Sequence, residues 1–328
     1  MGICVFKVSL ERFYKEFVMD YKKFIEDQIA QIKETVGGAK AINALSGGVD
    51  SAVVTVLGHR ALGEQLRTVF VDSALMREGE PQRTVEIFAE MGITVELADA
   101  RQEFLSALAG LTDPEEKRNA VTETFYSKVF GRLVKESGAT FLMHGTILTD
   151  IEETVAGIKR QHNILSQLGI EPESAYGYSV LEPLKTLRKD GVREVARLLG
   201  LPAELSERIP FPGPGLATRI VGEVTPERLE TVRTATSIVE QELADSGAFQ
   251  YMAVLLSDRA TGIRNNKREF GDIIVVRCVE SADAREATIT ELPWEKLNCI
   301  CERITQVNGV NRCLYDLTGK PPATIEYV

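Results

Sequence analysis

The sequence predicts an α/β protein in which a doubly wound parallel sheet is followed by a smaller C-terminal α+β domain. Three observations support this prediction. From residue 22 to about residue 208, apolar runs alternate with helical stretches, the pattern of a parallel sheet covered by helices on both faces. A polar break rich in glycine occupies residues 46–51, directly after the first apolar run. Beyond residues 209–215, which hold three prolines and two glycines, the order of helices and strands changes.

The N-terminal part of the chain supplies the predicted sheet. An amphipathic helix at about residues 21–36 ends at Gly37-Gly38, a common C-terminal stop. Residues 1–21 form an N-terminal extension, and the first domain is predicted to span residues 22–208. The apolar runs predict its strands at about residues 41–45, 67–72, 93–98, 140–144 and 179–182.

The C-terminal part, residues 209–328, is predicted to form the smaller domain. Its first segment, Ile-Pro-Phe-Pro-Gly-Pro-Gly, permits neither a helix nor a central strand, because proline has no N–H to donate. The pattern that follows predicts a long helix at about 225–246, strands near 250–256 and 272–279, a helix near 294–307, and strands near 312–317 and 323–327.

Composition restricts the partners. The 328 residues carry 48 acidic and 38 basic side chains, a net charge of −10, and no basic patch stands out, so we expect no nucleic acid partner. No apolar segment approaches the length of a membrane span, and charges interrupt the apolar N-terminus, so we expect a cytoplasmic protein without a membrane anchor. The five cysteines form no Cys-x-x-Cys pair, which favours reduced thiols over a metal site or disulfides.

The break at residues 46–51 reads Ser-Gly-Gly-Val-Asp-Ser and lies where a buried strand is predicted to pass into a helix. Glycine backbone turns sharply there, and the N–H groups of the loop and of the helix start favour an anion. The sequence therefore predicts a phosphate-binding loop, to which Ser46 and Ser51 add hydroxyl donors. The alternative is an ordinary tight turn capped by Asp and Ser.

The loop differs from a Walker A loop, because no Gly-Lys-Ser/Thr follows. Without that lysine it suits the pyrophosphate end of ATP. The carboxylate of Asp50 would repel phosphate directly. We therefore predict that it binds Mg²⁺ or contacts the ligands of the ion.

These six residues resemble the pyrophosphate loop of the N-type ATP pyrophosphatases, or PP-loop enzymes. The resemblance implies an adenine nucleotide alpha hydrolase-like fold and cleavage of ATP between its α- and β-phosphates. An acceptor oxygen would be adenylated, and a nitrogen or sulfur nucleophile would then displace AMP. The implied ATP-binding residues are Ser46, Gly47, Gly48, Val49, Asp50, Ser51, Asp72 and Gly145.

Six further segments occur in an order that resembles the ATP pyrophosphatase and dimerisation portions of the GMP synthetase family, over roughly residues 22–328. They are Val-Phe-Val-Asp-Ser (69–73), His-Gly-Thr (144–146), Ile-Lys-Arg-Gln-His-Asn (158–163), Leu-Glu-Pro-Leu-Lys (181–185), Phe-Pro-Gly-Pro-Gly-Leu (211–216) and Lys-Pro-Pro-Ala-Thr-Ile-Glu (320–326). The resemblance implies adenylation of xanthosine monophosphate (XMP) on its 2-oxygen and replacement of AMP by ammonia to give GMP. The implied XMP-binding residues are Arg118, Lys320, Thr324, Ile325 and Glu326; the alternative is plain surface charge.

Four more residues are predicted to act in catalysis. Asp150 and Glu153 are three positions apart and would share one face of a helix, where they would hold Mg²⁺ or orient a lid; a solvated helix is the alternative. The resemblance places Lys159 and His162 on that lid. Lys159 would neutralise phosphate charge, and His162 would donate a hydrogen bond or transfer a proton. We also expect His144 to line the adenine pocket.

Some residues depart from the family pattern. Gln161 replaces the first of two lid histidines and cannot titrate, and Asn265-Asn266-Lys267 replaces most of a Gly-Asp-x-Arg turn. The chain also has no His-x-Glu and no Gly-x-Cys-x-Gly elbow, so a glutaminase site is absent. Ammonia would therefore come from a separate glutamine amidotransferase subunit, and the resemblance implies a homodimer. Two alternatives stay open: a divergent paralogue adenylating another nucleotide-like acceptor, and a catalytically weak ATP-binding regulator of an amidotransferase.

Overall fold

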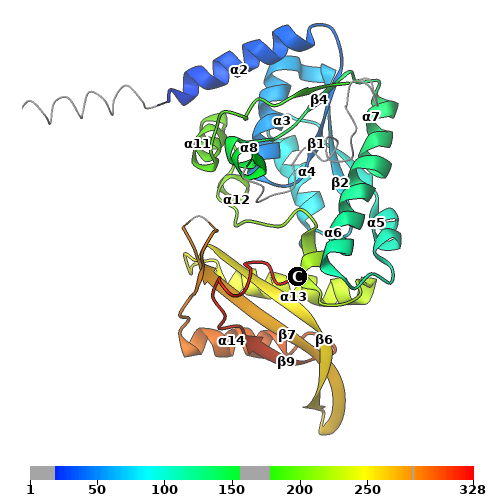
Figure 1. The fold of residues 1–328 in the computed structure, drawn as a ribbon, viewed down its shortest axis with the longest axis vertical. Coiled ribbons are helices and arrows are strands. Elements are labelled where there is room, and N and C mark those ends of the chain that lie inside the picture. The colour runs from blue at the N-terminus through cyan, green and yellow to red at the C-terminus, as the bar shows by residue number, and fades with distance from the viewer. Residues whose placement is uncertain (1–18, 156–177, 283) are drawn as a thin grey trace, which may run out of the picture. The chain divides into compact units, whose positions relative to one another are not determined.

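The computed structural model describes residues 19–155, 178–282 and 284–328 (Figure 1). Five strands form a sheet in the order β3-β2-β1-β4-β5, with parallel pairing, which confirms the predicted doubly wound α/β fold. From β1 the chain proceeds outward to β3 and then returns to β4. The switch point therefore lies between β1 and β4, where sheets of this kind bind ligands at the carboxyl ends of their strands. The strands are β1 (Ala41–Leu45), β2 (Leu66–Asp72), β3 (Glu96–Asp99), β4 (Phe141–Met143) and β5 (Ser179–Leu181).

Helices connect these strands. Among them are a short 3₁₀ turn, η1 (Gly63–Gln65), and a π-helical stretch, η2 (Thr124–Phe130). The α-helices are α2 (Tyr21–Val36), α3 (Val49–Leu62), α4 (Glu80–Glu90), α5 (Arg101–Leu108), α6 (Pro114–Glu123), α7 (Gly131–Ser137), α8 (Leu148–Val155), α11 (Lys189–Leu199) and α12 (Ala203–Ser206).

Local sequence explains where the first elements begin and end. The side chain of Asp20 accepts hydrogen bonds from two backbone N–H groups at the start of α2, and Gly37, with φ +56°, ends that helix as predicted. A buried polar link then joins β1 to α3. Asn43 donates to the hydroxyl of Thr55 at 2.7 Å, and that hydroxyl donates to the carbonyl of Ser51 at 2.8 Å. This link ties the first turn of α3 to the strand before it.

The C-terminal part forms a second sheet around a long antiparallel hairpin of β6 and β7 (Figure 1). Both strands extend well beyond their predicted ranges. At the tip, Asn265 and Asn266 have φ values of 50° and 62°, as a type I′ turn requires. Asn adopts this conformation more easily than most residues, so the departure noted at this turn fits its geometry. The elements are η3 (Gly215–Arg219), α13 (Pro226–Leu243), β6 (Gln250–Arg264), β7 (Lys267–Glu280), β8 (Thr288–Ile289), α14 (Trp294–Ile304) and β9 (Val310–Tyr315).

The predicted strand near 323–327 is wrong. Residues 321–328 form turns and bends without a strand. Two consecutive prolines, Pro321 and Pro322, directly precede the predicted range and cannot donate to a sheet ladder, so no strand enters it from that side. The fully buried Arg277 instead holds this segment, because its guanidinium donates to the carbonyls of Thr318, Thr324 and Ile325 at 2.6, 2.8 and 3.1 Å.

By its contacts the chain divides into two compact units. The first is made by the described parts of Met1–Asn43, Val49–Arg67 and Ala139–Glu207. The second is made by the described parts of Ala44–Gly48, Thr68–Gly138 and Arg208–Val328. The chain passes for the last time from the first unit to the second after Glu207, one residue from the predicted boundary at 208. The second unit, however, also contains earlier segments of the chain. The predicted domain boundaries therefore stay a prediction. Within the described residues, no helix combines the length and apolar character that crossing a membrane requires.

Candidate active site

The predicted phosphate loop connects β1 to α3, which begins at Val49. Ser46 and Gly48 are exposed, whereas Gly47 and Val49 are buried. Gly47 has φ +75°, and a Cβ on it would collide with the carboxylate of Glu80. The position therefore admits only glycine without rearrangement. Val49 anchors the first turn of α3 with its buried side chain, so any contact with ATP falls to its main chain.

Two charged residues that sequence reasoning missed, Arg208 and Glu80, hold the loop in place. The Arg208 guanidinium donates to the carbonyl of Gly47 at 3.0 Å and pairs with Glu80 at 2.7 Å. Glu80 is only 7% exposed. A signal existed in the sequence, because Arg208 directly precedes the proline-rich segment and Glu80 opens the helix after β2. Neither position, however, belongs to a motif with an assigned role.

Asp50, in the first turn of α3, has one satisfied and one unsatisfied oxygen. Its Oδ2 accepts from the ammonium of Lys189 at 2.7 Å, whereas its buried Oδ1 has no hydrogen-bond partner. A buried carboxylate oxygen without a partner is destabilising, and a cation would satisfy it. The residue after His144, Gly145, packs against this turn: a Cβ on Gly145 would lie 3.3 Å from that of Asp50. The structure thus brings Gly145 to the start of α3.

The available carboxylate oxygen of Asp50 suits an Mg²⁺ ion whose other ligands come from a nucleotide and water. Among the residues that the structure describes, no group of three or more His, Cys, Asp and Glu side chains is placed to hold a metal by itself. Mg²⁺ commonly takes one or two protein carboxylates and completes its shell with substrate phosphates and water. Asp50 fits that mode because one of its oxygens is unpaired.

Asp72 ends β2 and organises the turn that follows. Its Oδ1 accepts from the backbone N–H of Ala74 at 2.9 Å, and its Oδ2 lies 3.8 Å from the guanidinium of Arg101. His144 follows β4, where its Nδ1 lies 2.8 Å from the hydroxyl of Thr146. That hydroxyl donates to Glu182 at 2.7 Å. Thr146 and Glu182 belong to two of the family-like motifs but were not predicted as a pair. The roles of Asp72 and His144 toward ATP stay predictions.

The predicted catalytic residues are only partly described. Asp150 and Glu153 both lie on α8, as their spacing predicted. The Oδ2 of Asp150 accepts from the backbone N–H of Ile147 at 3.1 Å, so this carboxylate caps its own helix. The side chain of Glu153 lies outside the described residues, as do the whole of Lys159 and His162.

The structure brings Arg118 to the last residues of the chain, where the other predicted acceptor-binding residues lie. Arg118, on α6, pairs with Glu115 and donates to the carbonyl of Val328 at 2.8 Å, which joins positions 210 residues apart. Lys320 donates to the carbonyl of Ala284 at 2.8 Å. The hydroxyl of Thr324 donates to the carbonyl of Glu326.

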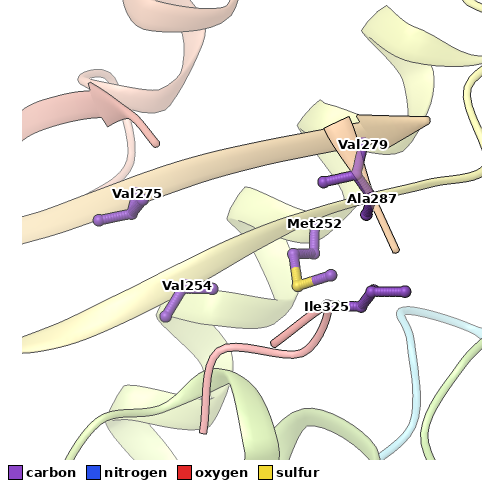
Figure 2. Close-up of a cluster of buried hydrophobic side chains, with 6 residues drawn as sticks. All are labelled: Met252, Val254, Val275, Val279, Ala287 and Ile325. Atoms are coloured by element: carbon purple, nitrogen blue, oxygen red, sulfur yellow. The ribbon is translucent and has the colours of Figure 1, made fainter. Parts of the chain in front are cut away.

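Ile325 anchors this segment through packing. Figure 2 shows its side chain in a cluster of buried hydrophobic residues from both long strands and from the segment just before β8, and it is 9% exposed. Its side chain therefore fixes the segment in place, and its predicted contact with a nucleotide would have to come from the main chain. The other members of the cluster are Met252, Val254, Val275, Val279 and Ala287.

Glu326 belongs to a buried polar cluster that sequence reasoning missed. Its Oε1 accepts from Gln250 at 2.5 Å and from Arg219 at 3.4 Å, and its Oε2 is buried without a partner. Arg219 is fully buried. Arg219 lies three residues after the Phe-Pro-Gly-Pro-Gly-Leu motif. This closeness to a family-like motif was the signal in the sequence that could have found it.

Lys117 anchors residues 217–222, the segment that contains Arg219. Lys117 is 2% exposed, and its ammonium donates to the carbonyls of Ala217, Ile220 and Gly222 at 3.3, 2.6 and 3.1 Å. Burial lowers the pKa of Lys117 to about 8. The charged form can supply all three hydrogen bonds, whereas a neutral amine can donate at most two.

Comparison with known proteins finds a matching family model for a segment in each half of the chain. The family model "NAD synthase" matches residues 18–128, and the model "GMP synthase C terminal domain" matches residues 237–327. The chain is 53% identical to a GMP synthase (glutamine-hydrolyzing) subunit of Archaeoglobus fulgidus, over 94% of this chain and 100% of that protein. The corresponding protein of Methanopyrus kandleri is 49% identical over 94% of this chain and 100% of its own length.

The protein of the same name from Pyrococcus furiosus is 46% identical, over 95% of this chain and 99% of its own length. The departures at the lid and the hairpin therefore occur within a chain that matches these relatives almost from end to end. The resemblance inferred from the motifs is confirmed, and the chain belongs to this family of GMP synthase (glutamine-hydrolyzing) subunits.

Proposed function

We propose that this protein aminates XMP to GMP at the expense of ATP, which is cleaved to AMP and pyrophosphate. The observation that carries the proposal is the loop after β1, where a left-handed Gly47 and the unpaired oxygen of Asp50 stand at the start of α3. Membership in the family of GMP synthase subunits supports the choice of acceptor. The protein would act in the cytoplasm, where nucleotides and ammonia are available.

In the proposed reaction, the amides of residues 46–51 bind the β- and γ-phosphates of ATP through the loop and the helix dipole. The 2-oxygen of XMP attacks the α-phosphorus, the bond to the bridging oxygen breaks, and pyrophosphate leaves. Ammonia then attacks C2 of the adenylated XMP, and AMP departs with the former 2-oxygen. Asp50 would hold Mg²⁺, which when bound neutralises charge on the departing pyrophosphate.

The remaining roles belong to the same proposal. Lys159 and His162 would act on the phosphates and on proton transfer, and Asp150 and Glu153 would hold Mg²⁺ or orient the lid. Arg118, Lys320, Thr324 and Glu326 would bind XMP, and the contact of Arg118 with Val328 supports a shared role. The word "subunit" in the relatives' names implies a partner, which we propose to be a glutamine amidotransferase that supplies the ammonia.

The test supplies the purified protein with XMP, ATP, Mg²⁺ and ammonium and follows GMP and AMP. We expect equal amounts of both products, and none when glutamine replaces ammonium. AMP formation only with another acceptor would favour the divergent paralogue. Intact ATP binding without turnover would favour the regulator.

Replacing Lys117 with Met is expected to raise the KM for XMP about tenfold with little change in kcat, because the segment carrying Arg219 loses its three-point anchor. In the wild type, this KM should rise as the pH passes through about 8, where Lys117 loses its proton. Steady-state kinetics between pH 7 and 9.5 measure both effects. A variant whose KM rises with pH as steeply as that of the wild type would contradict this role; the exposed Lys128→Met serves as control.

We also propose a homodimer formed through the C-terminal sheet. β9 pairs with β7 alone among the described strands, and the surface nearby exposes large apolar side chains, of which Leu317 is 77% and Leu314 47% exposed. Others on the same sheet and its helix are Ile263, Phe270 and Trp294.

Leu317→Glu is accordingly expected to convert a dimeric protein to a monomer in analytical ultracentrifugation, because a charge would be buried in the contact. The matched control is Leu198→Glu, an exposed leucine on α11 in the other compact unit, which should stay dimeric. A monomeric wild type, or a dimer unaffected by Leu317→Glu, would contradict this interface.

A further inference from the structure

The ring of Phe211 contacts two buried guanidinium groups. Arg77 stacks over it at 4.0 Å from the ring centroid, and Arg219 at 4.8 Å. Arg77 is 8% exposed and Arg219 is fully buried. Arginine stacks on an aromatic face through both its charge and its planar surface, and removal from water strengthens this interaction. Arg77 is far in sequence from Phe211 and Arg219, which lie eight residues apart, but all three side chains belong to the same compact unit.

On one side, this stack continues to the phosphate loop. The backbone N–H of Arg77 donates to Glu80 at 3.2 Å, and the other oxygen of Glu80 pairs with Arg208 at 2.7 Å. Arg208 in turn donates to the carbonyl of Gly47. Glu240, on α13, holds the Nε of Arg77 at 2.5 Å. An unbroken series of buried or half-buried contacts therefore connects Phe211 to Gly47.

On the other side, the stack continues to the acceptor segment. Arg219 donates to Glu326, which also accepts from Gln250. Several polar atoms of this arrangement are buried without a hydrogen-bond partner: the two terminal nitrogens of Arg77, one of which lies 3.9 Å from the Glu80 carboxylate, Nε and one terminal nitrogen of Arg219, and Oε2 of Glu326. Buried polar groups are normally satisfied, so the hydrogen bonding of this network is incomplete in the protein alone. A ligand that binds at the chain's last residues would complete it or shift it.

We propose that Arg77 is a positioning residue that couples the two substrate sites, so that the acceptor nucleotide tightens the phosphate loop on ATP. This inference rests on the proposed function. XMP at Glu326 would fix Arg219, Arg219 would fix Phe211, and Arg77 would transmit the constraint through Glu80 and Arg208 to Gly47. By reciprocity, ATP would favour XMP binding by the same factor.

The test measures this factor by calorimetry. The Kd of α,β-methylene-ATP, which cannot be cleaved at the relevant bond, is determined with and without saturating XMP. For the wild type we expect about tenfold tighter binding with XMP. In Arg77→Lys, which keeps the charge but loses the stacking plane, the ratio should fall below about twofold while each ligand alone binds nearly as before.

Arg233→Lys is the matched control. Arg233, which lies on α13 as Glu240 does, anchors the same loop by donating to the carbonyls of Ala74 and Met76 at 2.6 and 3.2 Å, but it lies outside the series. Arg233→Lys should therefore keep the wild-type ratio of Kd values. If Arg77 only stabilised the structure of this loop, the ratio would fall in both variants. Phe211→Leu removes the ring alone and should also abolish coupling, which keeps the test decisive if Arg77→Lys folds poorly.

Three results would overturn the inference: a ratio near one in the wild type, a full ratio in Arg77→Lys and Phe211→Leu, or an equal loss in Arg233→Lys. Each of them leaves GMP formation by the wild type untouched. An absence of XMP binding to the wild type would instead contradict the proposed function itself.

Discussion

Replacing Gly47 with Ala is expected to lower kcat/KM for ATP by about 100-fold or more, since the loop amides would no longer be held in place for the pyrophosphate. The new methyl group would collide with the carboxylate of Glu80, whose partner Arg208 holds the Gly47 carbonyl. The φ of +75° adds a backbone penalty of about 1–2 kcal/mol for a residue with a Cβ. Steady-state formation of AMP measures the effect.

The matched control for this variant is Gly92→Ala. Gly92 has the same φ of +75°, but a Cβ there would meet nothing within 4 Å. It therefore carries the backbone penalty without the collision, and kcat/KM should stay near the wild-type value. If both variants lose the same activity, general destabilisation explains the loss and the loop has no special role.

The second large effect is expected for Asp50→Asn. Loss of the negative charge removes the proposed Mg²⁺ contact, which we expect to lower kcat by about 100-fold, equivalent to about 3 kcal/mol. The Mg²⁺ concentration needed for half-maximal rate should rise as well. The amide is nearly isosteric with the carboxylate, so the fold should be retained. Rates measured over a series of Mg²⁺ concentrations test both statements.

Lys189→Met separates a metal role from an ion-pair role. The ammonium of Lys189 pairs with the Asp50 carboxylate and would compete with a cation for it. If Asp50 serves Mg²⁺, removing Lys189 should leave the rate high and lower the Mg²⁺ requirement. If Asp50 serves only the ion pair, Lys189→Met should impair the enzyme as much as Asp50→Asn, which would contradict our assignment.

The sheet and its loop were accessible from sequence because their signals are local. Buried parallel strands appear as apolar runs, and Ser-Gly-Gly-Val-Asp-Ser stands where a strand passes into a helix. The left-handed φ of Gly47 is a backbone requirement that glycine itself signals. The gathering of Arg118 with the last residues of the chain, by contrast, came from family resemblance and not from any local pattern.

The parts that sequence reasoning missed depend on contacts between distant segments. No periodicity links Arg77, Phe211 and Arg219, whose stacking exists only in the folded chain. The hairpin strands were predicted too short because their outer halves are exposed and lack an apolar run. The false strand near residue 325 arose because Ile325 reads as apolar and extended, although Arg277 satisfies the carbonyls there.

The central claim is that the loop after β1 binds the pyrophosphate of ATP while an oxygen of XMP attacks the α-phosphorus. The most direct test uses XMP labelled with ¹⁸O at position 2, together with ATP, Mg²⁺ and ammonium, and follows the label by mass spectrometry. We predict one ¹⁸O atom in the phosphate of AMP, unlabelled pyrophosphate and GMP without the label. Unlabelled AMP, or ADP with orthophosphate in place of AMP and pyrophosphate, would contradict it.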